Sequence, residues 1–256
     1  MRQDKLIRWA AIPLVMILYA STAKADLIAW YPLHGDATAM VGVDGDLING
    51  PTPAPDEKGN PNGALNFQTD PNDSFSFSPS NTGSYVSVQG GGGLPGLPRG
   101  TIALWVNWSG LQGQAYTASK TYGPVLARQS NGKYSNNILG ISDFDPNVGT
   151  LTWAPYNAGA PALVGGTPVG DNVWHFVAVT FDGTTSDQNL YLDGSLDGSP
   201  SAVTLNPDTS APLTIGAWIG DGAGYSNSTI HDLFIFDTVL TQDQLNTLKT
   251  TRMPPP

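Results

Sequence analysis

Two aspartates two positions apart, Asp143 and Asp145, have a spacing that suits acid–base chemistry. Residues i and i+2 of a strand point to the same face, so both carboxyl groups would face one way. Pro146 follows directly and marks a strand end, where aspartate usually supports a turn. The pair therefore carries two interpretations, catalysis and turn formation, and it is also a candidate for metal binding.

The sequence offers few other catalytic groups. Its only glutamate, Glu57, lies in a loop rich in Pro, Gly and Asn, and we expect its side chain to be solvated. No Gly-x-Ser-x-Gly or His-Glu-x-x-His motif occurs, so a hydrolase elbow and a zincin site are unsupported. The chain has no cysteine, which excludes thiol nucleophiles and Cys-ligated metals.

Aromatic side chains in polar segments form a second candidate site. A pyranose ring stacks its C–H face on an aromatic ring while amides or carboxylates bind its hydroxyls. The residues that best fit this chemistry are Trp153, Tyr156, Trp218 and Tyr225. The alternative for each ring is that it covers an end of the fold. Trp30, Trp105 and Trp174 lie inside apolar runs and are expected in the core.

The composition narrows the class of partner. The chain has 256 residues, 20 Asp, one Glu and a net charge of −10. A nucleic-acid-binding protein needs a basic stripe, so that class is excluded. Abundant aspartate suits Ca²⁺, which takes 6–8 oxygen ligands from carboxylates, amides and carbonyls. Calcium is therefore the cofactor that the sequence predicts.

Residues 1–25 have the pattern of a secretory signal peptide. Arg2, Lys5 and Arg8 precede an apolar run from Ala10 to Ala20, and Ala23-Lys24-Ala25 fits a cleavage site. The run is shorter than the about 20 residues that span a membrane. We therefore expect secretion into the periplasm or the medium, with no membrane insertion after cleavage. Cleavage leaves seven basic and 20 acidic residues, a net charge of −13.

The rest of the chain predicts many short strands separated by Gly, Pro, Asn and Asp clusters. In the run from Trp174 to Phe181 both alternating sets are largely apolar, which favours a strand buried on both faces. Asp182-Gly183 and Asp193-Gly194 predict tight turns. The strands are expected at residues 27–33, 64–67, 85–89, 101–108, 125–128, 138–144, 150–154, 173–181, 190–192, 213–219 and 231–236.

One helical signal stands out near the end of the chain. Thr241 and Gln244 form a capping box, and Leu245 and Leu248 give a short amphipathic turn. No linker divides the chain. We expect a signal peptide at 1–25, a single sandwich domain at 26–250 and a Pro-rich tail at 251–256.

Several of these segments, in their order and spacing, resemble the laminin-G-like domains of the concanavalin A-like lectin/glucanase superfamily. The resemblance covers about Asp26 to Thr250. Its most specific piece is WHFVAVTFDG at 174–183 followed by LYLDG at 190–194. The other pieces are LIAWYPLHGD at 27–36, GALNF at 63–67, YVSV at 85–88, TIALWVN at 101–107 and IHDLFIFDTVL at 230–240.

The resemblance implies an all-β jelly-roll sandwich of two antiparallel sheets with a short C-terminal helical turn. Relatives hold a cation on the convex side, which here implies Asp36 of the opening turn and Asp232 of the closing strand, with Asp44 and Asp46 nearby. A second implied site lies at the rim, where Asp143 and Asp145 meet Asp221. The convex site is the preferred one.

The resemblance also bears on catalysis. The glucanases of the superfamily carry an E-x-D-x-E run, which this chain lacks, and its lyases combine His with Tyr and Arg or Gln. His175 is the histidine considered for such a role, and a packed sheet histidine is the preferred interpretation. We therefore expect a secreted, calcium-stabilised, non-catalytic module that binds a polysaccharide or glycoconjugate. A glycan-active enzyme, and an adhesive or structural protein that contacts surface proteins, remain alternatives.

Overall fold

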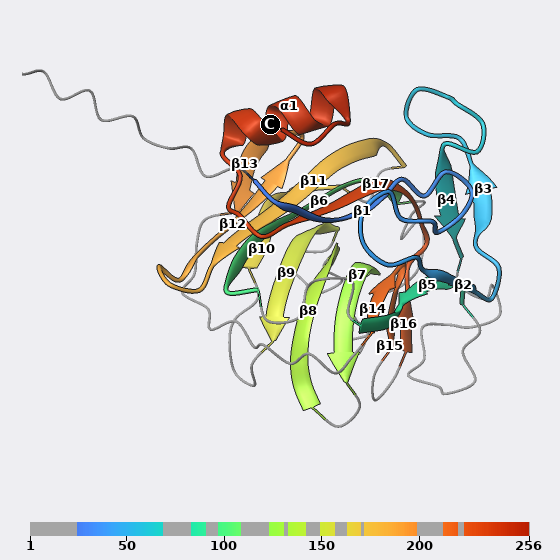
Figure 1. Cartoon of the computed structure of the whole chain (residues 1–256), viewed down its shortest axis with the longest axis horizontal. Helices are drawn as coiled ribbons and strands as arrows, with labels where there is room; N and C mark the ends of the chain where they lie inside the picture. Colours follow the sequence, from blue (N-terminus) through green and yellow to red (C-terminus); the bar gives the residue numbers. More distant parts are fainter. Residues whose placement is uncertain are drawn as a thin grey trace, which may run out of the picture.

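The computed structural model describes residues 25–68, 83–90, 97–108, 123–130, 133–141, 149–156, 163–169, 172–198, 212–219 and 223–255. These residues form two antiparallel sheets packed face to face, with one helix on the outer face of the first sheet (Figure 1). The predicted all-β, two-sheet sandwich is confirmed.

The first sheet has eight strands. Its hydrogen-bonded order is β13 (Ser195–Gly198), β12 (Asp187–Leu192), β11 (Trp174–Asp182), β6 (Arg99–Trp108), β17 (Ser228–Phe236), β4 (Ala64–Phe67) and β3 (Thr52–Ala54). The eighth strand, β1 (Leu27–Tyr31), pairs with β17. One edge of β17 thus carries β4 along its first part and β1 along its last part.

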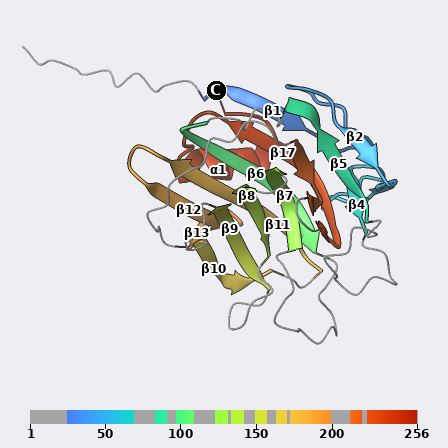
Figure 2. The ribbon, with the colours of Figure 1, turned by 90° about the horizontal axis from the view of Figure 1, so that it is seen from below.

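The second sheet has seven strands. Its order is β10 (Leu163–Pro168), β9 (Thr150–Tyr156), β8 (Lys133–Ile141), β7 (Gly123–Ser130), β14 (Leu213–Ile215), β5 (Tyr85–Val88) and β2 (Asp46–Ile48). Two further short strands, β15 (Ala217–Ile219) and β16 (Ala223–Tyr225), pair with each other. Seen from below, β7, β8 and β9 form one layer and β6, β11 and β17 the other (Figure 2).

The main core lies between the two sheets, and it is filled by apolar side chains from alternate positions of their strands. On β11 the residues Val177, Val179 and Phe181 face this core, while Phe176 and Ala178 pack under the helix. Because a strand sends alternate side chains to opposite faces, a strand apolar on both sides must be covered on both sides. The predicted two-sided burial of this strand is confirmed.

The helix α1 (Gln242–Thr251) begins at the predicted capping box. The Thr241 hydroxyl accepts from the Gln244 backbone, and the Gln244 side chain accepts from the Thr241 backbone. Leu245 and Leu248 are buried against the outer face of the first sheet. The helix is longer than the single turn expected, and it carries Arg252 as its C-cap into the segment that we expected to be a tail.

The turn signal at Asp193-Gly194 matches the structure, whereas after Asp182 the chain turns over four residues and the positive φ falls on Ser186. Asp193 and Gly194 have φ angles of 52° and 85°, as a tight turn between β12 and β13 requires. The run predicted at 213–219 is two strands, because Gly216 at φ 83° interrupts it beside the Phe67 ring. Five strands were missed: β2, β3, β10, β13 and β16. They are short, and β10 contains a Gly-Gly pair, so alternation is too brief to detect in them.

Candidate functional site

A bulge in β17 sets the geometry of the outer face of the first sheet. His231 lies opposite Trp105 and Phe234 opposite Ala103, so β17 has one residue more than β6 across this stretch. Asp232 takes up the extra length with φ 49°. As a result Leu233 points into the core, while His231 stacks on Trp105 of the outer face, with ring centroids 5.9 Å apart.

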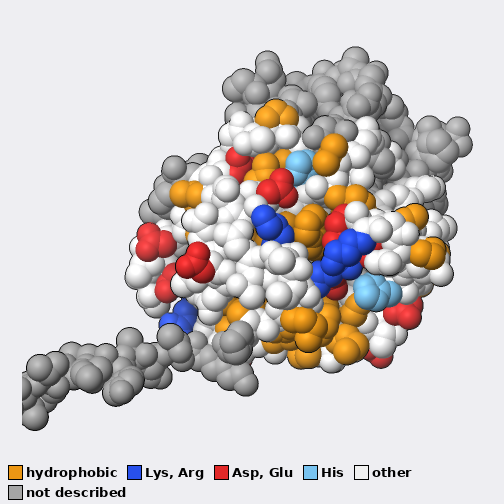
Figure 3. Space-filling view, turned by 90° about the horizontal axis from the view of Figure 1, so that it is seen from above, with side chains coloured by type: hydrophobic (Ala, Val, Ile, Leu, Met, Phe, Trp, Pro, Cys, Tyr) orange, Lys and Arg blue, Asp and Glu red, His pale blue; other side chains and the backbone are white. Residues whose placement is uncertain are grey.

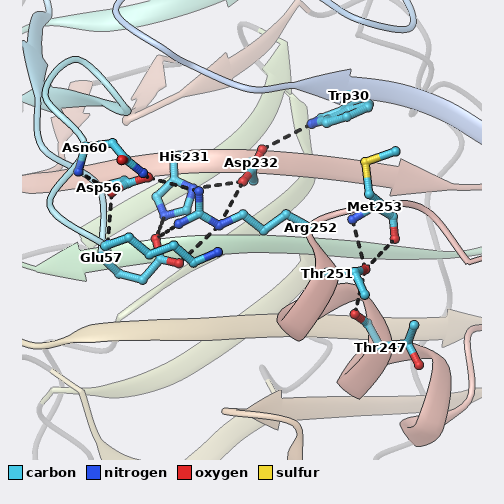
Figure 4. A network of polar contacts seen from close by, with 11 residues as sticks. Trp30, Asp56, Glu57, Asn60, His231, Asp232, Thr247, Thr251, Arg252 and Met253 are labelled. Carbon is cyan, nitrogen blue, oxygen red and sulfur yellow. Dashed lines mark hydrogen bonds and ion pairs between the residues drawn. The ribbon is translucent and has the colours of Figure 1, made fainter.

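Five residues around this bulge form what we call the Arg252 network: Asp56, Glu57, His231, Asp232 and Arg252 (Figure 4). The Arg252 guanidinium lies 2.9 Å from Asp56 Oδ2 and 3.7 Å from Asp232 Oδ2, and it also pairs with Glu57. His231 Nε2 lies 2.7 Å from Glu57 Oε2, and Nδ1 lies 3.1 Å from Asp232 Oδ2. His231 thus lies within ion-pairing distance of both carboxylates.

The network is largely closed to solvent. The His231 side chain is 0% exposed, those of Asp56 and Asp232 at most 3%, and those of Glu57 and Arg252 about 15%. Burial by itself raises the pKa of Asp56. Hydrogen bonds from Asn60, Arg252 and the Lys58 backbone outweigh burial and hold this pKa well below its usual range. Burial lowers the pKa of Arg252, but Glu57 and Asp56 raise it overall.

Every carboxylate of the Arg252 network therefore lies within ion-pairing distance of Arg252, and all three are largely buried. The expectation that Glu57 is solvated is wrong, because β17 and the end of α1 bring His231 and Arg252 to the loop between β3 and β4. The network joins three segments that are distant in sequence. Its chemical role is positioning: it fixes His231 beneath the Trp105 ring.

A row of polar residues crosses the outer face of the first sheet, next to the Arg252 network. Thr229 of β17 lies opposite Asn66 of β4 and opposite Asn107 of β6, and Asn107 lies opposite Trp174 of β11. We call Asn66, Thr229, Asn107 and Trp174 the polar row. All four are partly exposed. Polar side chains on three strands and an indole ring on the fourth are a usable binding surface, because an antiparallel sheet holds them at fixed spacing.

Aromatic rings lie at one end of the polar row and beside it. Trp174 contacts His231 edge to face at 5.0 Å, and Trp105, two residues before Asn107, packs against Phe176 at 5.7 Å. Trp30 is likewise half-buried on this face, where it stacks on Phe234 at 5.3 Å. Hydrophobic side chains reach the surface in several places on this side of the molecule, with charged side chains beside them (Figure 3). Trp30 and Trp105 pack against the apolar cluster under the helix, as expected of core residues, whereas Trp174 is half-buried outside both apolar clusters, contrary to expectation.

The alternation of apolar and polar residues in β6 indicates part of the polar row. In β6, Leu104, Val106 and Trp108 face the core, so Trp105 and Asn107 must face outward. An asparagine between two core positions marks the outer face of a strand. Which neighbours complete the row depends on register, which the sequence does not reveal.

The predicted aromatic platform is not assembled. Trp153 is fully buried between the sheets, where its indole donates to Gln188 Oε1 at 2.8 Å. Tyr225 is buried and lies near Tyr85, with ring centroids 6.2 Å apart. A platform needs an open ring face, so these two assignments are corrected. Trp218 is half-buried against Ala127 and Ala154 on the outer face of the second sheet. The Tyr156 side chain lies outside the described residues.

The preferred calcium site is not assembled either. Asp36 is exposed and accepts from the Thr38 backbone at 2.9 Å, as a turn aspartate does. Asp44 likewise accepts from the Ala39 backbone. Asp232 is engaged by Trp30, His231 and Arg252. Across the described ranges, no three His, Cys, Asp or Glu side chains are grouped to hold a metal ion. Asp143, Asp145 and Asp221 lie outside those ranges.

His175 is a sheet histidine at the start of β11. Its Nδ1 lies 2.9 Å from Asp193 Oδ2, and Asp193 Oδ1 accepts from the Phe176 backbone. Burial raises the pKa of Asp193, and these contacts with His175 and Phe176, together with the Lys249 charge, lower it overall. The pair ties the turn before β13 to β11, which agrees with the structural interpretation of this histidine.

The fold and this outer face define an all-β sandwich of the jelly-roll lectin and glucanase type. Residues 80–246 match the sequence profile described as the concanavalin A-like lectin/glucanases superfamily. The chain therefore belongs to that superfamily. The predicted resemblance is confirmed.

Solved structures and one curated relative agree with this assignment. Domain 4 of AbnA, a GH43 extracellular arabinanase from Geobacillus stearothermophilus solved with arabinotriose, gives a TM-score of 0.60 at 15% identity, covering 89% of this chain and all of that one. A structure of botulinum neurotoxin type C, whose cell entry depends on interaction with two ganglioside molecules, gives a TM-score of 0.58 at 13% identity, covering 90% of this chain and 51% of that one.

The curated relative is the rat (Rattus norvegicus) sushi, von Willebrand factor type A, EGF and pentraxin domain-containing protein 1. It is 25% identical over 175 residues, which are 65% of this chain and 4% of that protein. The chain thus spans a small part of this relative and about half of the neurotoxin structure. These likenesses establish the fold. In the part of the chain that the structure describes, no helix is long and apolar enough to cross a membrane.

Proposed function

We propose that this protein is a non-catalytic module that binds carbohydrate or a glycoconjugate through the outer face of the first sheet. The observation that carries the proposal is the polar row, with amides and a hydroxyl in register beside the Trp174 ring. Sugar sites combine these groups, since hydroxyls need donors and acceptors while ring C–H faces need an aromatic surface. Two proteins of similar fold support it, an arabinanase domain solved with arabinotriose and a botulinum neurotoxin that interacts with gangliosides.

The ion pairs of the carboxylates in the Arg252 network support a non-catalytic role. Glycoside hydrolysis needs two carboxyl groups that flank the bond and remain free to exchange protons. Asp56, Glu57 and Asp232 are instead held by Arg252 and His231. Their arrangement stabilises the sheet that carries the polar row.

The test is a glycan array followed by calorimetry on the variants Trp174→Ala and Trp218→Ala. We expect Trp174→Ala to lower affinity by about tenfold or more, as the loss of a central aromatic contact does. Tyr191→Ala is the matched control, because Tyr191 is a half-buried ring on the same sheet but outside the polar row. Loss of binding in Trp218→Ala alone would move the site to the second sheet. Turnover of a bound glycan, or binding to none, would contradict the proposal.

We also propose that residues 1–25 direct export and are removed. The support is the sequence pattern of the segment. Amino-terminal sequencing of protein recovered from the periplasm or the medium would test this, with Asp26 expected as the first residue. Recovery of an exported chain that retains Met1 would contradict cleavage.

A further inference from the structure

We infer that the polar row takes an uncharged oligosaccharide laid across the strands, from β4 to β11. The inference rests on the proposed function and names the ligand class of the same site. Its basis is the length of the row, the chemistry of its side chains and the distribution of charge around it.

The length of the polar row exceeds one sugar ring. Asn66, Thr229, Asn107 and Trp174 lie on four consecutive strands of the sheet, in the order β4, β17, β6 and β11. Neighbouring strands are about 4.8 Å apart, so the row extends over roughly 14 Å. A ligand that uses both Asn66 and Trp174 must therefore have several linked rings, and it must run perpendicular to the strands.

The side chains of the row match hydroxyl groups. Asn66 Nδ2 donates to Thr229 Oγ1 at 2.9 Å, and Asn66 Oδ1 accepts from Gln68 Nε2 at 2.9 Å. Asn107 Nδ2 donates to the Asn172 carbonyl at 3.2 Å. These bonds orient the amides and use part of their capacity, because each amide has two N–H donors and two acceptor lone pairs. The remaining donors and acceptors suit a ligand that offers both, as sugar hydroxyls do.

Charge argues against an anionic glycan. The polar row contains no Lys or Arg, and its neighbours Gln68 and Asn172 are uncharged. In the adjoining Arg252 network, Arg252 and His231 are already paired with three carboxylates of the chain itself. The chain as a whole carries a net charge of −10, which repels polyanions. A uronate or sialylated chain would lose the hydration of its carboxylates, and the described side chains of the polar row offer it no cation in return.

The experiment compares ligands by calorimetry at 50 and 300 mM NaCl: the neutral hexamers β-1,4-galactohexaose, cellohexaose, xylohexaose and arabinohexaose, each with its own monosaccharide, and the anionic hexagalacturonate. We expect at least one neutral hexamer to bind tenfold or more tighter than its monosaccharide, with affinity unchanged within twofold by salt. Hexagalacturonate should bind at least tenfold more weakly than that neutral hexamer.

Variants at the two ends of the row test the direction of the chain. Asn66→Ala and Trp174→Ala should each lower affinity for the neutral hexamer at least fivefold, whereas Tyr191→Ala should not. Thr229→Val removes one hydroxyl at constant shape, so it keeps the test valid if Asn66→Ala does not fold. Preferred binding of the anionic hexamer, or equal affinity for monosaccharide and hexamer, overturns this inference while glycan binding stands. Binding of no glycan overturns both.

Discussion

Arg252 is the central residue of the network that stabilises the outer face of the first sheet. It is the C-cap of α1, with φ 54°, and its guanidinium contacts carboxylates from the β3–β4 loop and from β17. Removing the cation leaves Asp56, Glu57 and Asp232 close together in a largely closed site. Breaking a buried ion pair from one side typically costs more than the pair itself contributes, because the remaining charges are uncompensated.

We therefore expect Arg252→Ala to lower the free energy of unfolding by about 3 kcal/mol. Urea unfolding followed by tryptophan fluorescence measures the change. Arg99→Ala is the matched control, because Arg99 is exposed and its loss should change stability by at most about 0.5 kcal/mol. If the two variants unfold at the same urea concentration, the Arg252 network does not stabilise the fold.

The lowered pKa of Asp56 predicts a pH dependence. A carboxyl group whose pKa is lower in the folded protein stabilises it above the unfolded pKa of about 3.9, and this stability is lost as the pH falls through the folded pKa. Stability should therefore decrease as the pH falls below about 4. Asp56→Asn should be less stable at pH 7 and show a smaller decrease. Urea titrations between pH 3 and pH 7 measure both, and parallel curves would rule out Asp56 as a source of the dependence.

At the scale of the elements, the outer face depends on two local irregularities. The bulge at Asp232 brings His231 under Trp105, and the capping box at Thr241 starts α1 where Leu245 and Leu248 can reach the sheet. The helix covers Phe176 and Phe234 and also delivers Arg252 to its partners. Packing of α1 thus contributes to the order of the Arg252 network as well as to the second apolar cluster.

Leu248→Ala should lower the free energy of unfolding by about 2–5 kcal/mol, because it leaves a cavity between α1 and the sheet. Thr250→Ala is the control, since Thr250 is an exposed residue of the same helix. Thermal melting monitored by circular dichroism measures both variants. If Leu248→Ala and Thr250→Ala have the same melting temperature, Leu248 does not pack between the helix and the sheet.

At the scale of the whole molecule, the sandwich leaves little unpaired strand edge. The edge strands β2 and β3 have three residues each, and Pro53 sits in β3, where a missing N–H donor discourages further pairing. On the opposite side Gly198 of β13 approaches the Val164 carbonyl of β10, so the two sheets close against each other there. These features favour a discrete sandwich over edge-to-edge association.

Calcium binding stays a prediction at this scale, and it now rests on Asp143 and Asp145. A ligand that binds only the folded state raises the free energy of unfolding, by about 2.7 kcal/mol at a hundredfold excess over its dissociation constant. Ca²⁺ should therefore raise the melting temperature relative to EDTA, and Asp143→Ala with Asp145→Ala should abolish the difference. Asp36→Ala should retain it. Equal melting in Ca²⁺ and EDTA would contradict calcium binding.

Much of the fold could be predicted from the sequence because its determinants are local. Alternation in the strand from Trp174 to Asp182, the positive φ angles of Asp193 and Gly194, and the capping box at Thr241 depend on residues within a few positions of one another. The strands β2, β3 and β16 were missed for the same reason, since their three residues contain no period.

The candidate site could not be predicted, because it depends on register between distant strands. Asn66 and Thr229 are 163 residues apart, and Asp56 and Arg252 are 196 apart, yet each pair is in hydrogen-bond contact. The sequence by itself determined a sandwich of the lectin and glucanase type and its acidity. The tertiary structure decided that Trp153 is buried, that Trp174 is half-buried on the outer face beside His231 and that Asp232 pairs with Arg252. These are long-range contacts, and only the folded chain brings such residues together.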